Sequence, residues 1–231
     1  MNVTNHGLQW YVDKIEAGET FSLARYGNGE IGGILGNLRR TPSGSQSFTP
    51  ELRGALVEAL QYRDETYYLA LQNERYLRNL GLWSSWRKWC VECAPGIEWH
   101  FGDVFHRANR RGDLGPLVKA LKARGVLMVG PEWLRSLDVA RWNVTIQHKD
   151  CWTEIDAITD LAARATPGTV VSVSAGPAGK VLVRRLHERL AGRCWVIDFG
   201  SVWDVLAGVT SRRYHRSMDE NVIKRNLGGK K

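Results

Sequence analysis

The sequence predicts an α/β fold in which one mostly parallel sheet is flanked by helices. Three observations predict it: strand-like and helix-like segments alternate at least five times, no segment repeats, and no linker divides the chain. The 231 residues are enough for one large domain, and 43% apolar with 24% charged residues is typical of a globular protein. We therefore expect one domain over residues 1–210, followed by a basic tail over residues 211–231.

Each predicted element is marked by apolar residues at helical spacing or by a β-branched or aromatic run between turn residues. In the first half these elements are a helix through Leu8, Val12 and Ile15 that Gly18 ends, a strand over 20–25, a helix after the turn at 27–29, a flexible loop over 40–48, a helix that Thr49 caps with Pro50 at its first position, and a strand over 66–71.

The second half continues the alternation and ends in a strand. Its predicted elements are a helix over 114–124, strands over 126–129 and 142–147, a helix opened by a capping box of Thr153 and Asp156, a strand over 169–174, a helix through Val181 and Leu186, and a strand over 194–199.

The charge of the chain favours anionic partners. Its net charge is +8, and residues 211–231 contribute seven basic against two acidic residues. No apolar run approaches the roughly 18 residues that a membrane span needs, and the N-terminus lacks both the basic and the apolar region of a secretion signal. We expect a cytoplasmic protein without a membrane span.

The first of three polar loops at predicted strand ends runs from Arg25 to Glu30. Ligands of parallel sheets gather at the carboxyl ends of strands, so these loops are candidate sites. Gly27 and Gly29 let the backbone approach a ligand, while Arg25 suits a phosphate and Glu30 a metal or a sugar. A plain strand-to-helix turn, with Glu30 placed favourably at the helix dipole, explains the same residues equally well.

The second loop, from Ser174 to Lys180, offers backbone N–H groups that suit a diphosphate, and Lys180 adds a positive charge. A tight turn without a ligand is the alternative, since the spacing of Gly176 and Gly179 matches neither a Walker A loop nor GxGxxG. The third loop begins at Asp198, a carboxylate that suits a ribose, a metal, an acceptor hydroxyl or the N-cap of the next segment.

Four segments together resemble the GT-D type glycosyltransferases. Phe21–Glu30 resembles the opening motif of that family, Ser174–Leu182 its Gly-Pro segment, Val196–Gly200 its Asp-x-Gly strand end, and Val129–Pro131 its middle strand. The resemblance runs over most of residues 8–205, and it leaves residues 72–113 and the basic tail uncovered. It implies a Rossmann-like core and transfer of a sugar from a nucleotide diphosphate donor, such as UDP-glucose, to a hydroxyl group.

The resemblance also implies roles for individual residues. Glu30 and Asp198 are the expected catalytic residues, and Glu30 with Asn28 the expected ligands of Mn²⁺ or Mg²⁺. The family's aspartate is Asn28 here, whose amide oxygen is a weaker ligand, so metal dependence is in doubt. Glu132 and Asp150 are alternatives to Asp198 as the base. The expected donor-binding residues are Arg25, Gly27, Asn28, Gly29, Ser174, Gly176, Pro177 and Lys180.

The acceptor has to be inferred from charged and aromatic residues outside the resemblance. Cations bind phosphates and aromatic rings stack on extruded bases, so interleaved basic and aromatic residues favour nucleic acid. We expect an enzyme of a bacteriophage-like type that glycosylates DNA at 5-hydroxymethylcytosine, with the flipped base beside Trp83 or Trp86. The expected acceptor-binding residues are Trp83, Trp86, Arg87, Lys88, Arg110, Arg111, Arg212 and Arg213.

Three other interpretations remain open from the sequence. Leu82, Trp86, Trp89 and Cys93 recur at helical spacing, which is also the pattern of a buried helix face. The acceptor could instead be a protein Ser or Thr or a surface glycan. Finally, Asn28 is compatible with a non-catalytic nucleic-acid-binding module on a degenerate transferase scaffold.

Overall fold

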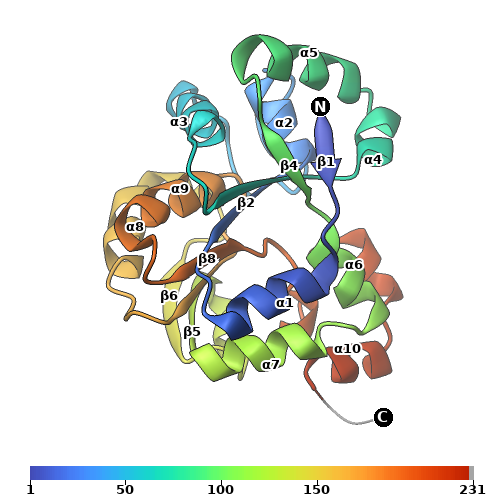
Figure 1. The fold of residues 1–231 in the computed structure, drawn as a ribbon. Helices are drawn as coiled ribbons and strands as arrows, with labels where there is room; N and C mark the ends of the chain where they lie inside the picture. The colour runs from blue at the N-terminus through green and yellow to red at the C-terminus, as the bar shows by residue number, and fades with distance from the viewer. Residues whose placement is uncertain (229–231) are drawn as a thin grey trace.

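Eight parallel strands form one open sheet in the computed structural model, which describes residues 1–228 (Figure 1). Their order across the sheet is β1-β4-β3-β2-β8-β7-β5-β6, and every neighbouring pair is parallel. The fold class predicted from the sequence is therefore confirmed. The strands are β1 (Asn2–Thr4), β2 (Ser22–Tyr26), β3 (Tyr67–Leu71), β4 (Glu98–Phe101), β5 (Val126–Pro131), β6 (Trp142–Ile146), β7 (Val170–Val173) and β8 (Trp195–Asp198).

Helices cover both faces of the sheet, each over its own apolar core. One core joins the sheet to α3, α5, α8 and α9, and the other joins it to α1, α6 and α7 (Figure 1). The α-helices are α1 (Gly7–Ala17), α2 (Asn28–Ile34), α3 (Pro50–Gln61), α4 (Glu74–Asn79), α5 (Trp83–Cys93), α6 (Val104–Arg111), α7 (Gly115–Arg124), α8 (Ile155–Ala162), α9 (Ala178–Leu190) and α10 (Glu220–Asn226).

The centre of the sheet lies between β2 and β8, where its two halves meet. From β2 the chain builds outward through β3 and β4, and from β5 it returns through β7 to β8. The residues of β7 and β8 are all buried, since helices cover both faces of these strands, which explains why they are apolar except for Ser172 and Asp198. The loops that follow β2, β7 and β8 therefore emerge side by side at one edge of the sheet.

Of the two helix N-caps predicted from the sequence, one is confirmed and the other is wrong. Thr49 caps α3, since its side-chain oxygen accepts from the Leu52 N–H at 3.2 Å, with Pro50 in the first turn. The predicted capping box of Thr153 and Asp156 does not form. Residues 151–154 instead make a 3-10 turn, the Thr153 hydroxyl donates to the Asp150 carbonyl, and α8 begins at Ile155.

Strand β1, at the edge of the sheet, and its neighbour β4 were not expected from the sequence. They contain only three and four residues and pair with each other, so neither has the length or alternation that identifies a strand locally. Segment 72–113, which the family resemblance leaves uncovered, completes this side of the fold with α4, α5, β4 and α6.

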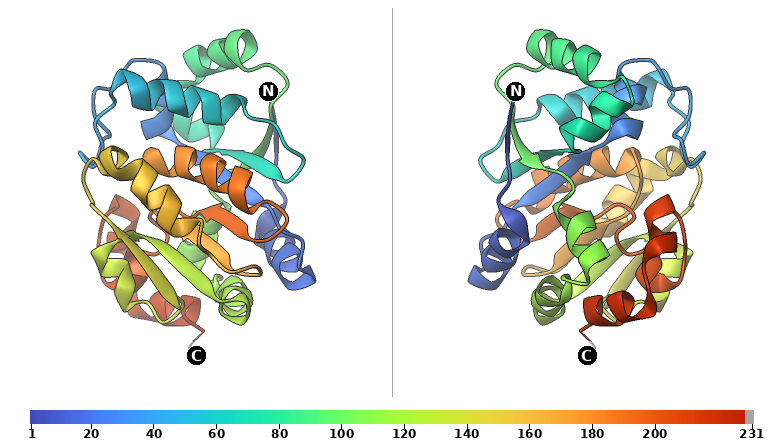
Figure 2. Two further views of the ribbon diagram at one scale, coloured as in Figure 1. Left: turned by 90° about the vertical axis from the view of Figure 1, so that its left-hand side faces the viewer. Right: turned by 90° about the vertical axis from the view of Figure 1, so that its right-hand side faces the viewer.

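The segment predicted to be a basic tail packs on the rest of the fold as far as the structure describes it. Helix α10 lies against α6 and α7, and Tyr214 of a 3-10 turn over 213–217 packs against His106 of α6 (Figures 1 and 2). Asn226 is fully buried there: its side-chain oxygen accepts from the Leu114 N–H, and its amide donates to the carbonyl oxygens of Asn109. Lys230 and Lys231 lie outside the described residues.

Within residues 1–228, no helix combines the length and apolarity that a membrane crossing requires.

We predict that Asn226→Ala lowers the free energy of unfolding by about 2–3 kcal/mol. The substitution leaves the Leu114 N–H and an Asn109 oxygen buried without their partner, and each such group costs about 1–3 kcal/mol. Urea denaturation at pH 7 measures the change. Asn221→Ala is the matched control on an exposed position of α10 and should shift stability by less than about 0.5 kcal/mol. Equal effects of the two variants would contradict this account of the C-terminal segment.

We further predict that stability falls between pH 7 and pH 5, in part because of His100. Burial, together with the positive charges of His6 and Lys14, lowers its pKa to about 4, and a hydrogen bond of 2.9 Å joins its Nδ1 to the Tyr11 hydroxyl. The unfolded chain binds this proton near pH 6.5 and the folded chain does not, so acid favours unfolding. Between pH 7 and pH 5, the free energy of unfolding of His100→Gln, measured by urea denaturation, should fall by about 1–2 kcal/mol less than that of wild type. His148→Gln, at an exposed position, should keep the wild-type pH dependence.

Candidate active site

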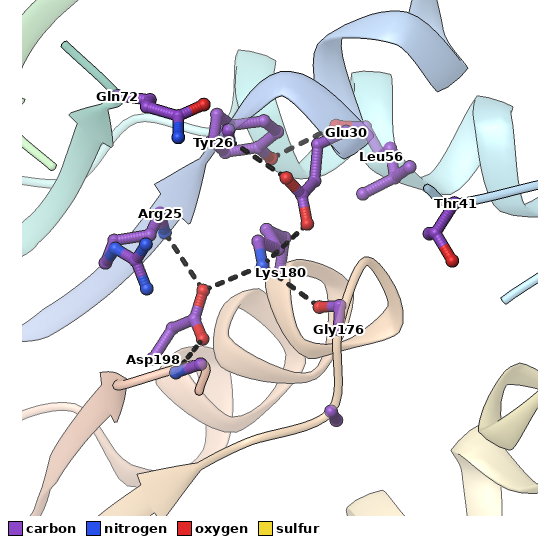
Figure 3. A network of polar contacts seen from close by, with 12 residues as sticks. Arg25, Tyr26, Glu30, Thr41, Leu56, Gln72, Gly176, Lys180 and Asp198 are labelled. Atoms are coloured by element: carbon purple, nitrogen blue, oxygen red, sulfur yellow. Dashed lines mark hydrogen bonds and ion pairs between the residues drawn. The ribbon is translucent and has the colours of Figure 1, made fainter. Parts of the chain in front are cut away.

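Three side chains from the ends of β2, β7 and β8 meet at the carboxyl edge of the sheet (Figure 3). The Lys180 ammonium lies 2.9 Å from Glu30 Oε1 and 3.0 Å from Asp198 Oδ2. It also donates to the Gly176 carbonyl at 3.0 Å, so its three N–H donors have three partners. The polar loops predicted from the sequence are thus brought together by one lysine.

Burial makes this ion cluster tight. The side chains of Lys180 and Asp198 are 5% and 0% exposed, and that of Glu30 is 11% exposed. Burial by itself raises the pKa of Glu30, but the Lys180 charge and the Gly27 N–H bond outweigh it and hold that pKa below its ordinary value. Burial likewise lowers the pKa of Lys180, and Asp198 and Glu30 raise it above its ordinary value. Glu30 and Lys180 are therefore both charged at neutral pH.

Arg25 donates hydrogen bonds to neighbouring loops and so holds them together. Its backbone N–H donates to Asp198, its Nε donates to the Gly102 carbonyl at 2.7 Å, and its Nη1 to the Phe199 carbonyl at 3.3 Å. Gly200, at φ +56°, makes this possible, because a Cβ there would lie 2.8 Å from Arg25 Nη1.

The glycine-rich turn after β2 is fixed by two side chains. The Gly27 N–H donates to Glu30 Oε2 at 2.9 Å, and the Asn28 N–H donates to Gln72 Oε1 at 2.8 Å. Glu30 thus both caps α2 and pairs with Lys180, which unites the structural and the functional interpretations of this residue. Gln72, at the end of β3, was missed because nothing in its local sequence marks it.

The carboxylates expected to act as a base are all engaged. Asp198 is fully buried, and its second oxygen accepts from the Gly200 N–H at 3.0 Å. Glu132 is exposed and pairs with Arg135. Asp150, at φ 52°, accepts from the Ser47 N–H and pairs with Arg40, so it anchors the loop over residues 40–48.

The donor set at Glu30 and Asn28 does not fit a divalent cation in this arrangement. Both Glu30 oxygens already have partners, and a metal between Glu30 and Asp198 would have to displace the Lys180 ammonium. Within residues 1–228, no group of three or more His, Cys, Asp or Glu side chains is placed to hold a metal ion. Metal binding by Glu30 and Asn28 stays a prediction.

A polar cleft lies beside the ion cluster, over the ends of β5, β6, β7 and β8. Ser45 of the 40–48 loop and Ser174 and Gly176 of the β7–α9 loop line one part of it. Trp133, Asp204 and Arg212 line another part. The Ser174 hydroxyl is buried and has no hydrogen-bond partner, which leaves it available to a ligand. Trp133 and Asp204 were missed because their neighbours in sequence form no motif.

The predicted stacking platform for a flipped base is wrong. Trp86 is fully buried and stacks on Trp89 at 5.2 Å between ring centroids, as the alternative interpretation expected of Trp86, but Cys93 is exposed and the buried residues of α5 are Trp83, Trp86 and Cys90. Trp83 is 6% exposed, and the Arg78 guanidinium lies over its ring. The rings fill the core between α5 and the sheet, because burial of large aromatic surface stabilises the folded protein. Arg87 and Lys88 are exposed on the outer side of α5.

The remaining basic residues of the predicted acceptor surface come together near the cleft. Arg110 and Arg111 end α6, and the Arg110 guanidinium lies over the ring of Tyr214. Arg212 and Arg213 precede Tyr214 in the C-terminal segment and are exposed, and Arg212 lines the cleft. The fold therefore places four of the predicted cations on two adjoining segments.

The fold is similar to that of solved structures. One is described as the highly conserved domain of unknown function 1792, with a distinct glycosyltransferase fold; its TM-score is 0.70 at 18% identity, over 88% of this chain and 79% of that chain. Another, described as a new glycosyltransferase (DUF1792) from Streptococcus sanguinis, has a TM-score of 0.69 at 17% identity, over 88% and 83%. No family model and no curated protein matches the sequence. The chain thus has a glycosyltransferase-like fold.

We predict that Lys180→Met lowers the free energy of unfolding by about 3–5 kcal/mol at pH 7, because two buried carboxylates lose their cation. Lowering the pH to 5 should narrow the deficit. Without Lys180, burial raises the pKa of Glu30, so the folded variant takes up a proton and gains stability as the pH falls toward 5, whereas the wild-type contribution of Glu30, whose pKa is lowered, is lost only at lower pH.

Urea denaturation of both proteins at the two pH values tests this. Lys224→Met is the matched control, since Lys224 forms an exposed pair with Glu220 and its loss should cost less than about 1 kcal/mol. If Lys180→Met lowered the free energy of unfolding by no more than Lys224→Met, the buried cluster would not be what holds the loops.

Proposed function

We propose that the protein is a glycosyltransferase that moves a hexose from a nucleotide diphosphate donor to a hydroxyl acceptor. The observation that carries the proposal is the polar cleft at the carboxyl edge of the sheet, beside the N-terminus of α9, in a glycosyltransferase-like fold. Ligands of open parallel sheets bind at this edge. The buried, unpartnered Ser174 hydroxyl supports a ligand at this place.

The donor diphosphate is expected to lie at the loop from Ser174 to Pro177. The N-terminus of α9, a helix of 13 residues, directs backbone N–H groups and a partial positive charge to this loop. Arg212, which lines the same cleft, is placed to add a full charge. Lys180 acts behind the loop, where its bond to the Gly176 carbonyl fixes the backbone that receives the diphosphate.

Each of these groups has a role in the reaction. When the bond between the sugar and the diphosphate breaks, negative charge develops on the leaving oxygen, and preorganised donors aimed at that oxygen lower the barrier. The ion cluster keeps these donors from rearranging, since each of its members is bonded to another loop of the site.

For the acceptor we propose DNA carrying 5-hydroxymethylcytosine. The support is the net charge of +8 and the exposed arginines of α6 and the C-terminal segment, Arg110, Arg111, Arg212 and Arg213, of which Arg212 lines the cleft, because phosphate contacts by Lys and Arg supply most non-specific DNA affinity. A protein Ser or Thr, a surface glycan, or nucleic-acid binding without catalysis are the other outcomes that the experiment separates.

The test is a panel of sugar nucleotides, including UDP-glucose, offered with hydroxymethylated or unmodified duplex DNA, with and without Mn²⁺. Nucleoside mass spectrometry should show a hexose added only to the hydroxymethylated base. Arg212→Ala should lower this activity at least tenfold, because Arg212 lines the cleft. Arg216→Ala, an exposed arginine of the same segment, is the matched control and should change it less than threefold.

Three other results would have distinct meanings. Donor hydrolysis without transfer to DNA would keep the transferase and move the acceptor to protein or glycan. Salt-dependent DNA binding with neither hydrolysis nor transfer would support the non-catalytic module. A chain that binds no sugar nucleotide and no DNA would contradict both.

A further inference from the structure

Asp204 is a further carboxylate at the carboxyl edge of the sheet. It lies in the turn after β8, is 6% exposed, and is the one acidic residue among the described residues that line the cleft. No local pattern selects it, because Ser201-Val202-Trp203-Asp204 matches no motif.

The carboxylates selected from the sequence are paired with cations. Glu30 and Asp198 share the Lys180 ammonium, Asp150 pairs with Arg40, and Glu132 pairs with Arg135. A carboxylate held by a cation is a weak proton acceptor, because the cation stabilises its charged form. Asp204 makes no ion pair within residues 1–228, so its charge is not neutralised by a neighbour at contact distance.

Two neutral donors orient Asp204 instead. The Trp133 indole N–H donates to Oδ1 at 3.0 Å, and the Ser211 hydroxyl donates to Oδ2. Trp133 and Ser211 also line the cleft, so the carboxylate is held within its wall. Each carboxylate oxygen has two lone pairs, and one bond to each leaves capacity to accept a proton from a ligand.

We propose that Asp204 is the general base of the transfer, a role that rests on the proposed function. The carboxylate takes the proton of the acceptor hydroxyl as its oxygen forms a bond to the anomeric carbon. The bond from that carbon to the diphosphate oxygen breaks, and its electron pair leaves with the nucleoside diphosphate. Asp204 then returns the proton to water, so that charge and atoms balance over one turnover.

The surroundings of Asp204 hold further charged and titratable groups. Arg212, Tyr214 and His215 approach it from the C-terminal segment, and His148 lines the cleft from the loop after β6. His148 is exposed and packs against Trp133, which makes it the rival base. A test of Asp204 therefore has to include His148.

The experiment compares Asp204→Asn with wild type in the transfer assay and in hydrolysis of UDP-glucose, where water is the acceptor. We expect kcat to fall by about 10²–10⁴-fold, the usual contribution of a general base. Binding of UDP, measured by calorimetry, should change less than threefold, and the acidic limb of the wild-type pH profile should disappear. The amide still accepts from Trp133 and can donate to Ser211, so the thermal midpoint should be retained.

His148→Gln tests the rival base, and Asp160→Asn, at an exposed carboxylate of α8 outside the cleft, is the matched control that should keep kcat within threefold. If Asp204→Asn does not fold, Trp133→Phe replaces it. This variant keeps the carboxylate but removes the donor that orients it, so kcat should fall roughly tenfold with unchanged UDP affinity.

The failures of the two proposals are distinguishable. An active wild type whose Asp204→Asn variant keeps its rate and its pH profile overturns the base and leaves the transferase standing. Loss of the acidic limb in His148→Gln instead assigns the base to His148 and also overturns Asp204. A wild type that neither binds UDP nor turns over any sugar nucleotide overturns the proposed function, and the base with it.

Discussion

The arrangement of the whole site depends on one buried ammonium group. Lys180, on the first turn of α9, is bonded to Glu30 beyond β2, to Asp198 at the end of β8 and to the Gly176 carbonyl beyond β7. Charges taken out of water are stable only when their partners surround them, so these three loops cannot move independently. Arg25 extends the same constraint to the loop after β4 through the Gly102 carbonyl. The edge of the sheet where a ligand would bind is therefore preorganised by charge.

Polar residues that hold the loops and polar residues that face a ligand look alike in sequence, but the structure distinguishes them. Glu30, Asp198 and Lys180 use their bonding capacity on one another, so they hold the backbone that faces the cleft. The groups that face the cleft are of another kind, and they include the Ser174 hydroxyl, the Asp204 carboxylate and the Arg212 guanidinium. The buried ions hold the backbone that carries the polar groups of the cleft, and preorganised donors need not reorient during a reaction.

The distribution of aromatic and basic residues follows the same physical rules. Trp86 is buried because a large ring gains more from packing in the core than it could gain at the surface, while Arg87 and Lys88 on the same helix stay in water. The arginines of α6 and of the C-terminal segment lie together because Asn226 and Asn109 join these segments in the interior. The segment that composition alone separates as a tail thus forms part of the wall of the cleft.

The sequence by itself determined the α/β class, most helices and central strands, and the three polar loops, because periodicity, caps and glycine-rich turns are local signals. It also placed Glu30, Lys180 and Asp198 at one edge, since parallel strands end together. Only the tertiary structure decided that these three neutralise one another, that Trp86 is buried and that Asp204 lines the cleft. Those outcomes depend on which side chains from distant segments come within bonding distance, and no local pattern encodes such distances.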